Sequence, residues 1–478
     1  MQLWTLVLVP LVAAAAHGRD EGFKLKQYRL EDYMHLNDSH TETEAASISS
    51  VTQEWFEAQK VDHTDATNKA VWKQQYLVND EFYGGPGSPV FLYISGENSI
   101  SNKWIQSTNA FVGQLAQENK AMMVALEHRY YGNSQPVPNC PGGHCKLPRH
   151  FVQKKKLSTS SPWISFGGSY AGSLSAWLKL KYPTRFAGAV ASSGPIQARA
   201  DFSAYSDVVS NDIKLLGGST CAQSLQNGLT EFHRLVASTN SNDAATLKQL
   251  FNPCYTMRTD DDRAVMEYYL YLSIIGDAQY TPENFQSFCT AFLADSTLTP
   301  VQRLSRLSKS TGESCSYNSY SGYLANFGGT TIDQEGWSRQ WKYQMCREFG
   351  FAQATATATG VFSPLKYITT NVLLNKLCQS VYNIADVDAN VAATNQRYGG
   401  FKINVENVVS PSSSYDPWSA LALSNSTGVV NPKSQVVYIQ GGSHCRDLYA
   451  RKPSDPAPIQ WAHDQIQAAV KRFLSKKK

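Results

Sequence analysis

The chain has 478 residues, of which 42% are hydrophobic and 17% are charged. This length exceeds a single minimal domain and suits a large domain with an insertion, or two to three domains of about 150 residues each. The formal net charge of +4 is small, and the dense basic runs at 154–156 and 476–478 are typical of solvated surface. Nucleic-acid binding is therefore not expected.

The first residues form an apolar segment that ends in small residues. Ala14 and Ala16 resemble an A-x-A cleavage site, and Arg19 follows. This pattern predicts a secretory signal peptide at 1–18, although a positive n-region is missing; the alternative is a buried first strand or helix. No later apolar run has the roughly 20 residues that span a bilayer, so no membrane span is expected.

Nine cysteines are present, and no pair has the C-x-x-C spacing typical of zinc sites. We expect neither a metal nor a cofactor. In an oxidising compartment the six central cysteines are expected to form disulfides, although their pairing cannot be deduced. Sequons at Asn37 and Asn425 predict glycosylation sites on the same secretory route. The six cysteines are Cys221, Cys254, Cys289, Cys315, Cys346 and Cys378.

Short apolar runs of the kind found in buried parallel strands recur in the first and last parts of the chain. Helical stretches lie between them at 109–118 and 173–182, and the last stretch, 459–474, has apolar residues at helical spacing. Alternating strands and helices predict an α/β sheet. The expected strands are 90–95, 122–126, 163–166, 187–191, 408–409 and 436–439.

In the middle of the chain the strand pattern fades and amphipathic stretches take over, at 212–236, 262–275 and 281–294. We interpret 197–395 as a helical insertion that interrupts the sheet. The predicted organisation is a signal peptide (1–18), the first part of the sheet domain (45–196), the insertion (197–395) and the second part of the sheet domain (396–478).

The segment 163–172 has the layout of a nucleophile elbow, a sharp turn from strand to helix that exposes one hydroxyl. An apolar run leads into two glycines and Ser169, and a helical stretch follows. Small residues are needed at Gly167 and Ala171 because the backbone doubles back there. The pattern is G-x-S-x-A, and the alternative is a Gly/Ser-rich turn in an ordinary α/β protein.

A serine nucleophile needs a base and an acid that orients the base. In an α/β-hydrolase the chain order is Ser, acid, His. Asp416 follows the run at 408–409, and His444 follows the expected strand at 436–439. Both lie in turn-rich loops at the carboxyl edge of the expected sheet, where such sites occur. We therefore predict a triad of Ser169, Asp416 and His444.

Other histidines fit this role less well. His128 precedes Ser169 and does not fit the order, His63 lies in a polar N-terminal stretch, and His463 is assigned to the solvated face of the last helix. The oxyanion hole needs two backbone N–H groups. One is predicted at Tyr170, and the other at Gly96 or Glu97 in the loop after strand 90–95.

Further stretches resemble a known family. E-H-R-Y-Y-G at 127–132 and D-P-W at 416–418, together with the elbow, are specific motifs. On these residues the chain resembles the serine carboxypeptidase S28 family. The matching stretches are 61–63, 72–76, 89–93, 126–132, 167–172, 191–195, 341–350, 416–418 and 442–444.

The resemblance implies an α/β-hydrolase fold with an inserted helical cap domain and the same Ser169, Asp416 and His444 triad. It also implies an exopeptidase that cleaves peptides on the carboxyl side of proline, because the cap restricts access to one chain end. Peptides with proline near one terminus would be the substrates. The protein would be secreted or reside in the lumen of lysosomes or endosomes, and a homodimer is implied by analogy alone.

The chain departs from the family pattern in three places. Ser412-Ser413 replaces a usual Asn-Gly, and the loop at 96–98 lacks the fuller Gly-rich form. Between Ser134 and Ser169 the amphipathic helix of the relatives is missing, which leaves open a remodelled segment or an imperfect gene model. Two other functions stay open: another acyl hydrolase such as a lipase or esterase, and a non-catalytic secreted relative.

Overall fold

The structure, a computed structural model, describes residues 51–63, 65, 67–136, 158, 160–276, 278–309, 314–331 and 336–475. The predicted signal peptide at 1–18, the sequon at Asn37 and most of the segment that departs from the family, 137–157, lie outside the described residues.

An eight-stranded sheet forms the centre of one half of the molecule, in the order β1-β2-β4-β3-β5-β6-β9-β10. From β4 to β10 neighbouring strands pair in parallel, whereas β1 and β2 pair with each other and with β4 in antiparallel fashion. The predicted α/β sheet is confirmed, and this topology is that of an α/β-hydrolase. The strands are β1 (Val51–Lys60), β2 (Val71–Asn79), β3 (Val90–Ile94), β4 (Met122–Leu126), β5 (Trp163–Gly168), β6 (Gly188–Ser192), β9 (Val408–Ser413) and β10 (Gln435–Ile439).

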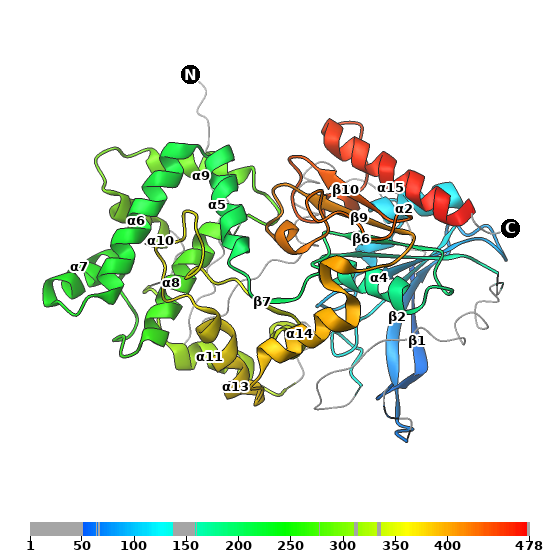
Figure 1. Cartoon of the computed structure of the whole chain (residues 1–478), viewed down its shortest axis with the longest axis horizontal. Coiled ribbons are helices and arrows are strands. Elements are labelled where there is room, and N and C mark those ends of the chain that lie inside the picture. Colours follow the sequence, from blue (N-terminus) through cyan, green and yellow to red (C-terminus); the bar gives the residue numbers. More distant parts are fainter. Residues whose placement is uncertain are drawn as a thin grey trace.

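Helices cover both faces of this sheet (Figure 1). One face buries the apolar sides of α2 (Phe111–Asn119) and the C-terminal α15 (Ala457–Ser475). The other face is covered by α4 (Tyr170–Lys181), whose Ala171, Leu174 and Leu178 pack with side chains of β3 and β4. Because both faces are covered, β3 and β4 are apolar throughout, which is why the sequence revealed them as continuous runs. The strand β9 continues from Val409 into buried serines, so the expected run at 408–409 gave only its first two residues.

The antiparallel strands β1 and β2 were not predicted, because they are not apolar runs. Gln59 and Gln74 are buried and their side chains share a hydrogen bond of 2.6 Å. Gln74 also donates to the main-chain oxygen of Glu127 at 2.8 Å. Their amides are satisfied by partners that are distant in the sequence, so the local pattern does not reveal that these two positions are buried.

A largely helical region lies between β6 and β9 in the chain and beside the sheet in space (Figure 1). The stretch expected as one helix at 212–236 is two helices that break at Gly217 and Gly218, where Gly218 has φ 89°. The elements are the short strands β7 (Arg199–Asp201) and β8 (Gly350–Ala352), and the helices α5 (Ala204–Leu216), α6 (Ser219–Ala237), α7 (Ser241–Phe251), α8 (Asp260–Ile275), α9 (Asn284–Leu293), α10 (Pro300–Lys309), α11 (Tyr320–Gly328), α12 (Ser338–Gln344), η2 (Met345–Phe349), η3 (Asn371–Asn375), α13 (Lys376–Tyr382) and α14 (Val387–Tyr398).

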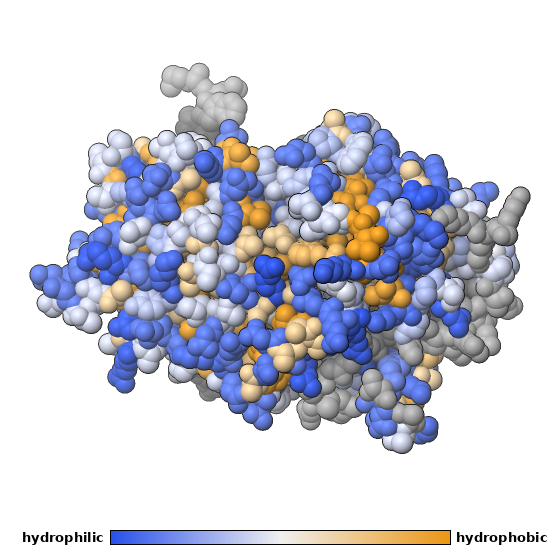
Figure 2. Space-filling view, viewed as in Figure 1, coloured by the Kyte–Doolittle hydropathy of each residue, from blue (hydrophilic) through white to orange (hydrophobic). Residues whose placement is uncertain are grey.

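Four short 3-10 helices complete the described elements: η1 (Asn102–Trp104), η4 (Gly400–Lys402), η5 (Pro417–Leu421) and η6 (Arg446–Leu448). On the face shown in Figure 2, hydrophobic side chains gather toward the middle, between the helical region and the sheet, within a mostly hydrophilic surface. Asn425, the predicted glycosylation site that the structure describes, is exposed in a turn.

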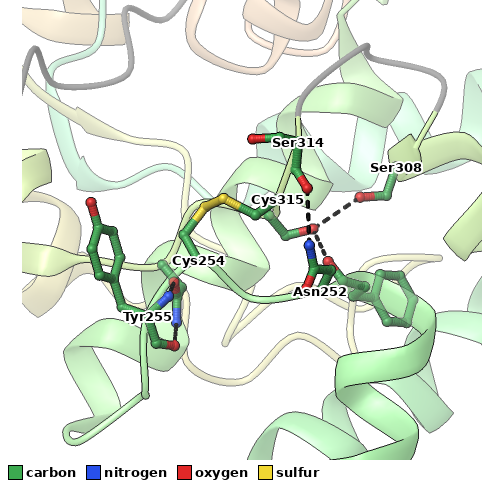
Figure 3. Close-up of a disulfide and its surroundings, with 9 residues drawn as sticks. Asn252, Cys254, Tyr255, Ser308, Ser314 and Cys315 are labelled. Atoms are coloured by element: carbon green, nitrogen blue, oxygen red, sulfur yellow. Dashed lines mark hydrogen bonds between the residues drawn. A yellow bond between two sulfur atoms is a disulfide. The ribbon is translucent and has the colours of Figure 1, made fainter. Parts of the chain in front are cut away.

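All six central cysteines form disulfides within the helical region, as expected. The pairs are Cys221–Cys289, Cys254–Cys315 and Cys346–Cys378. Hydrogen bonds flank the second bridge, including one from the Asn252 amide to the main-chain oxygen of Ser314 at 2.9 Å (Figure 3). Each bridge joins residues that are 32 to 68 positions apart, so the pairing follows from packing rather than from spacing.

Candidate active site

Ser169 lies at the junction of β5 and α4 in a strained backbone conformation, with φ 58° and ψ −131°. Non-glycine residues avoid this region, and such strain is typical of functional turns. The Ser169 N–H donates to the main-chain oxygen of Ser192 at the end of β6 at 3.0 Å. The predicted strand-to-helix turn is therefore present, with the serine at its apex.

Close backbone approaches explain the small residues around Ser169. A Cβ atom on Gly167 would collide with the main-chain oxygen of Ala171, and one on Gly172 would collide with the main-chain oxygen of Ser192. Neither obstacle is a flexible side-chain end. The glycines thus permit the chain to double back and to pack α4 against the end of β6.

Asp416 and His444 lie together at the carboxyl ends of β9 and β10. The His444 Nδ1 atom is 2.8 Å from Asp416 Oδ1, and both side chains are fully buried. The same Asp416 oxygen accepts the main-chain N–H of Trp418 at 2.9 Å, which caps η5. Because a carboxylate only accepts, the neutral form of His444 carries its proton on Nδ1 and presents the lone pair of Nε2.

The surroundings of His444 favour proton uptake. Burial by itself lowers the pKa of the imidazole, but the Asp416 carboxylate and the neighbouring Cys445 together outweigh burial and raise the pKa well above its ordinary value. The His444 Nε2 atom has no hydrogen-bond partner among the described residues, so a bond to Ser169 is not formed in this structure. Catalytic hydrogen bonds are often loose without substrate.

The loop that carries His444 packs against the end of β5. A Cβ atom on Gly168 would lie 3.0 Å from the Sγ atom of Cys445, the residue after His444. The Cys445 N–H donates to the Oγ atom of Ser193 at 3.0 Å, next to the residue that holds the Ser169 N–H. The structure thus brings together the segments that carry Ser169, Asp416 and His444, although these are far apart in the sequence.

The two expected oxyanion segments are also neighbours. Gly96 follows β3, and a Cβ atom there would lie 3.9 Å from the Ala171 Cβ atom and 4.0 Å from its nitrogen. Tyr170 is the first residue of α4, where main-chain N–H groups have no partner within the helix. The loop at Gly96 therefore borders the first turn of α4.

A hydrogen-bonded chain around Tyr170 was missed by sequence reasoning. His128, set aside as a base, uses Nδ1 on the main-chain oxygen of Arg129 at 2.7 Å, so its Nε2 accepts from the Tyr170 hydroxyl at 3.1 Å. The Tyr170 hydroxyl accepts from Gln344 at 2.8 Å, and the Tyr131 hydroxyl donates to the amide oxygen of Gln344. His128 thus supports the residue that follows Ser169.

Aromatic residues line the other side of His444. Trp418 is nearly buried and its ring centroid is 6.4 Å from that of His444. It also packs against Phe202 and Phe351, with ring centroids 5.2 and 5.3 Å away, so this tryptophan is part of the core. Tyr280, from the loop between α8 and α9, meets the His444 ring edge-on at 5.7 Å.

The assignment of His463 to a solvated face was wrong. Its side chain is fully buried, its Nε2 atom is 3.1 Å from the main-chain oxygen of Asp447, and burial lowers its pKa to about 4. The apolar stripe of α15 includes this position because the helix packs its histidine against Phe111 at 4.0 Å. Helical spacing identified the stripe, but the polar residue type hid His463 within it.

Two further observations concern metal binding and membrane-spanning helices. Among the described residues, no group of three or more His, Cys, Asp or Glu side chains could hold a metal ion. In the same part of the chain, no helix is long and apolar enough to span a membrane.

The chain is similar to known peptidases. The family model for serine carboxypeptidase S28 matches residues 59–466. A thymus-specific serine protease of Mus musculus is 31% identical over 457 residues, which cover 88% of this chain and 87% of that protein. A lysosomal Pro-X carboxypeptidase of Mus musculus is 26% identical, and the match covers 85% of each chain. Together with the α/β-hydrolase topology, these matches show that the chain belongs to the serine carboxypeptidase S28 family and is a serine-type peptidase.

Proposed function

We propose that the protein is a serine-type exopeptidase that cleaves peptides on the carboxyl side of proline, with Ser169, Asp416 and His444 as its catalytic triad. The observation that carries the proposal is the buried pair of His444 and Asp416, whose loop packs against the strand that ends at Ser169. Fold alone does not imply this chemistry, and the arrangement of these residue types supports the proposed triad.

In the proposed reaction His444 Nε2 takes the proton of the Ser169 hydroxyl as the serine oxygen attacks the scissile carbonyl carbon. The main-chain N–H groups of Tyr170 and of Gly96 stabilise the negative oxygen of the tetrahedral intermediate. The imidazolium, held by Asp416, returns the proton to the leaving amine, and an acyl-enzyme remains. Water, deprotonated by His444, then releases the acid and restores the serine.

The proline preference rests on the relatives and on the aromatic surroundings of His444. A protein named lysosomal Pro-X carboxypeptidase is among the relatives, and Trp418 and Tyr280 place apolar rings beside the histidine. We propose residues 45–196 and 396–478 as the catalytic domain and 197–395 as a helical cap that limits access to one peptide terminus. A lumenal or secreted location agrees with the three disulfides.

A labelling experiment tests the nucleophile. Purified protein should react with a fluorophosphonate probe, and Ser169→Ala should not, whereas Ser287→Ala, an exposed serine on α9, should react like the parent chain. Labelling of the Ser169→Ala variant would contradict the triad. A parent chain that is folded and never labelled would identify a non-catalytic relative.

A peptide panel tests the specificity. Peptides with proline at successive positions from each end should be cut on the carboxyl side of proline near one terminus, with products identified by mass. Turnover of simple esters without cleavage of any proline peptide would contradict the peptidase proposal and favour another acyl hydrolase.

A further inference from the structure

The loop between α8 and α9 reaches from the helical region to the histidine of the proposed triad. The main-chain oxygen of Gln279 accepts the N–H of His444 at 2.9 Å. His444 is fully buried, and a buried main-chain N–H needs an acceptor. That acceptor comes from the helical region rather than from the sheet.

The side chain of Gln279 makes two more contacts. Its Oε1 atom accepts the indole N–H of Trp418 at 3.1 Å and lies 3.5 Å from the hydroxyl of Tyr205 on α5. An indole N–H only donates, so this contact determines which end of the amide faces Trp418. The main-chain N–H of Trp418 in turn donates to Asp416.

Gln279 therefore touches both loops that hold the proposed acid and base. Its main chain contacts the loop of His444, and its side chain contacts Trp418, whose main-chain N–H donates to Asp416. The neighbouring Tyr280 adds an edge-on contact of its ring with the imidazole. A shift of this loop would move the histidine relative to both Asp416 and Ser169.

We propose that Gln279 is a positioning residue of the active site, which fixes the loops of His444 and Asp416 relative to each other. The alignment of the proposed acid and base therefore depends on how the helical region packs against the sheet. The inference rests on the proposed triad of Ser169, Asp416 and His444. Gln279 acts through His444 and takes no part in bond making or breaking.

The test compares Gln279→Leu, which removes the acceptor of the Trp418 indole, with Gln279→Glu, which retains an acceptor oxygen. Gln286→Leu, an exposed glutamine on α9, is the matched control. Rates per active site, counted by fluorophosphonate titration, separate alignment from loss of folded protein. A misplacement of about 1 Å can cost up to about a hundredfold in rate. We expect kcat for Gln279→Leu to fall about tenfold or more with little change in KM.

The pH profile supplies a readout that a merely structural role would not move. Gln279→Leu keeps the main-chain oxygen that accepts the His444 N–H but removes the acceptor of the Trp418 indole, so the Trp418 residue that donates to Asp416 loses a contact. A displaced Asp416 stabilises the imidazolium less, so the acid limb of kcat/KM should shift to lower pH. Gln279→Glu should recover most of the rate, and Gln286→Leu should match the parent chain.

Two results would overturn the inference. The first is a kcat per active site in Gln279→Leu that equals that of the parent chain. The second is a loss of kcat in Gln279→Leu that Gln279→Glu does not recover and that leaves the acid limb of kcat/KM at the same pH. Failure of the triad itself is separate, because it is reported by labelling of Ser169→Ala. An unlabelled Ser169→Ala together with an unaffected Gln279→Leu rejects the positioning role and leaves the proposed function intact.

Discussion

His444 and Asp416 form a fully buried pair in which the imidazole Nδ1 atom lies 2.8 Å from a carboxylate oxygen. The second oxygen of Asp416 has no hydrogen-bond partner among the described residues. The pair thus depends on one short contact, which selects the tautomer of His444 and stabilises its charged form.

Replacing the acid tests this relationship. In Asp416→Asn the amide can donate to Nδ1, which favours the wrong tautomer, and the rate should fall by about 10⁴-fold, as in other serine triads. The loss of the anionic partner lowers the pKa of His444, so the acid limb of the residual kcat/KM should move to lower pH. A steady-state pH profile measures both effects, and an unchanged rate would reject Asp416 as the acid.

The Asp212 carboxyl predicts how stability depends on pH. It is fully buried on α5 with neither oxygen hydrogen-bonded to a described residue. Burial first, and then the charge of Asp416, raise its pKa to about 8. In the unfolded chain this carboxyl loses its proton near pH 4. Between about pH 4 and 8 the native state therefore binds one proton that the unfolded state does not, and the stability of the native state falls as pH rises.

Asp212→Asn, which is neutral in both states, should remove this pH dependence. Its melting temperature should exceed that of the parent chain by about 2 °C or more at pH 8, and the difference should shrink toward pH 4. Asp80→Asn, at an exposed carboxyl, is the control. A constant offset between Asp212→Asn and the parent chain across this range would contradict the prediction. Calorimetric scans at several pH values measure it.

The close packing of the elbow predicts that one added methyl group at Gly172 lowers both stability and reactivity. In Gly172→Ala the new Cβ atom would collide with the main-chain oxygen of Ser192, which also holds the Ser169 N–H. Overpacking of this kind costs about 1–3 kcal/mol, and here the strain falls on the serine itself. We expect a lower melting temperature and slower fluorophosphonate labelling.

Gly328→Ala is the control for this substitution, since no atom lies within 4 Å of its added Cβ. If Gly172→Ala labelled as fast as Gly328→Ala, the elbow would tolerate the methyl group and the argument from close approach would be wrong.

The bridge between Cys254 and Cys315 predicts a stability effect outside the active site. It links residues 61 positions apart, and closing a loop of this size is worth about 4 kcal/mol in the chain-entropy account. The variant with both cysteines replaced by serine should unfold at lower urea concentration. Its reactivity per folded molecule should persist, because the bridge joins the segment after α7 to the segment before α11 and so lies within the helical region. An unchanged urea midpoint would contradict this.

Much of the sheet and of the proposed site could be predicted from local patterns. The strand at 122–126 has the predicted bounds, and the elbow at Ser169 was recognised from ten consecutive residues. Apolar runs and glycine positions reflect demands of the backbone that act within a few residues, so they can be read along the chain. The order Ser, acid, His then pointed to Asp416 and His444.

Other features depended on packing between distant segments. The buried glutamines of β1 and β2 look like surface residues until their partners are known, and His463 looked solvated for the same reason. The three disulfide pairings and the hydrogen-bonded chain from His128 to Gln344 join residues that no spacing rule connects. Burying a polar side chain costs little free energy only when a hydrogen-bond partner is in place, and the fold determines which residue that partner is.

The residues that would perform the chemistry could thus be predicted from the sequence, because nucleophile, acid and base each follow a strand in a fixed order. The contacts that these residues make with distant segments could not be predicted from the sequence. Gln279 reaches His444 from a loop 165 positions earlier in the chain, and Asp212 lies close enough to Asp416 for their charges to interact. Residue types and strand order predict the reactive groups, whereas their alignment and protonation depend on contacts between segments that are distant in the chain, both within the sheet domain and between it and the helical region.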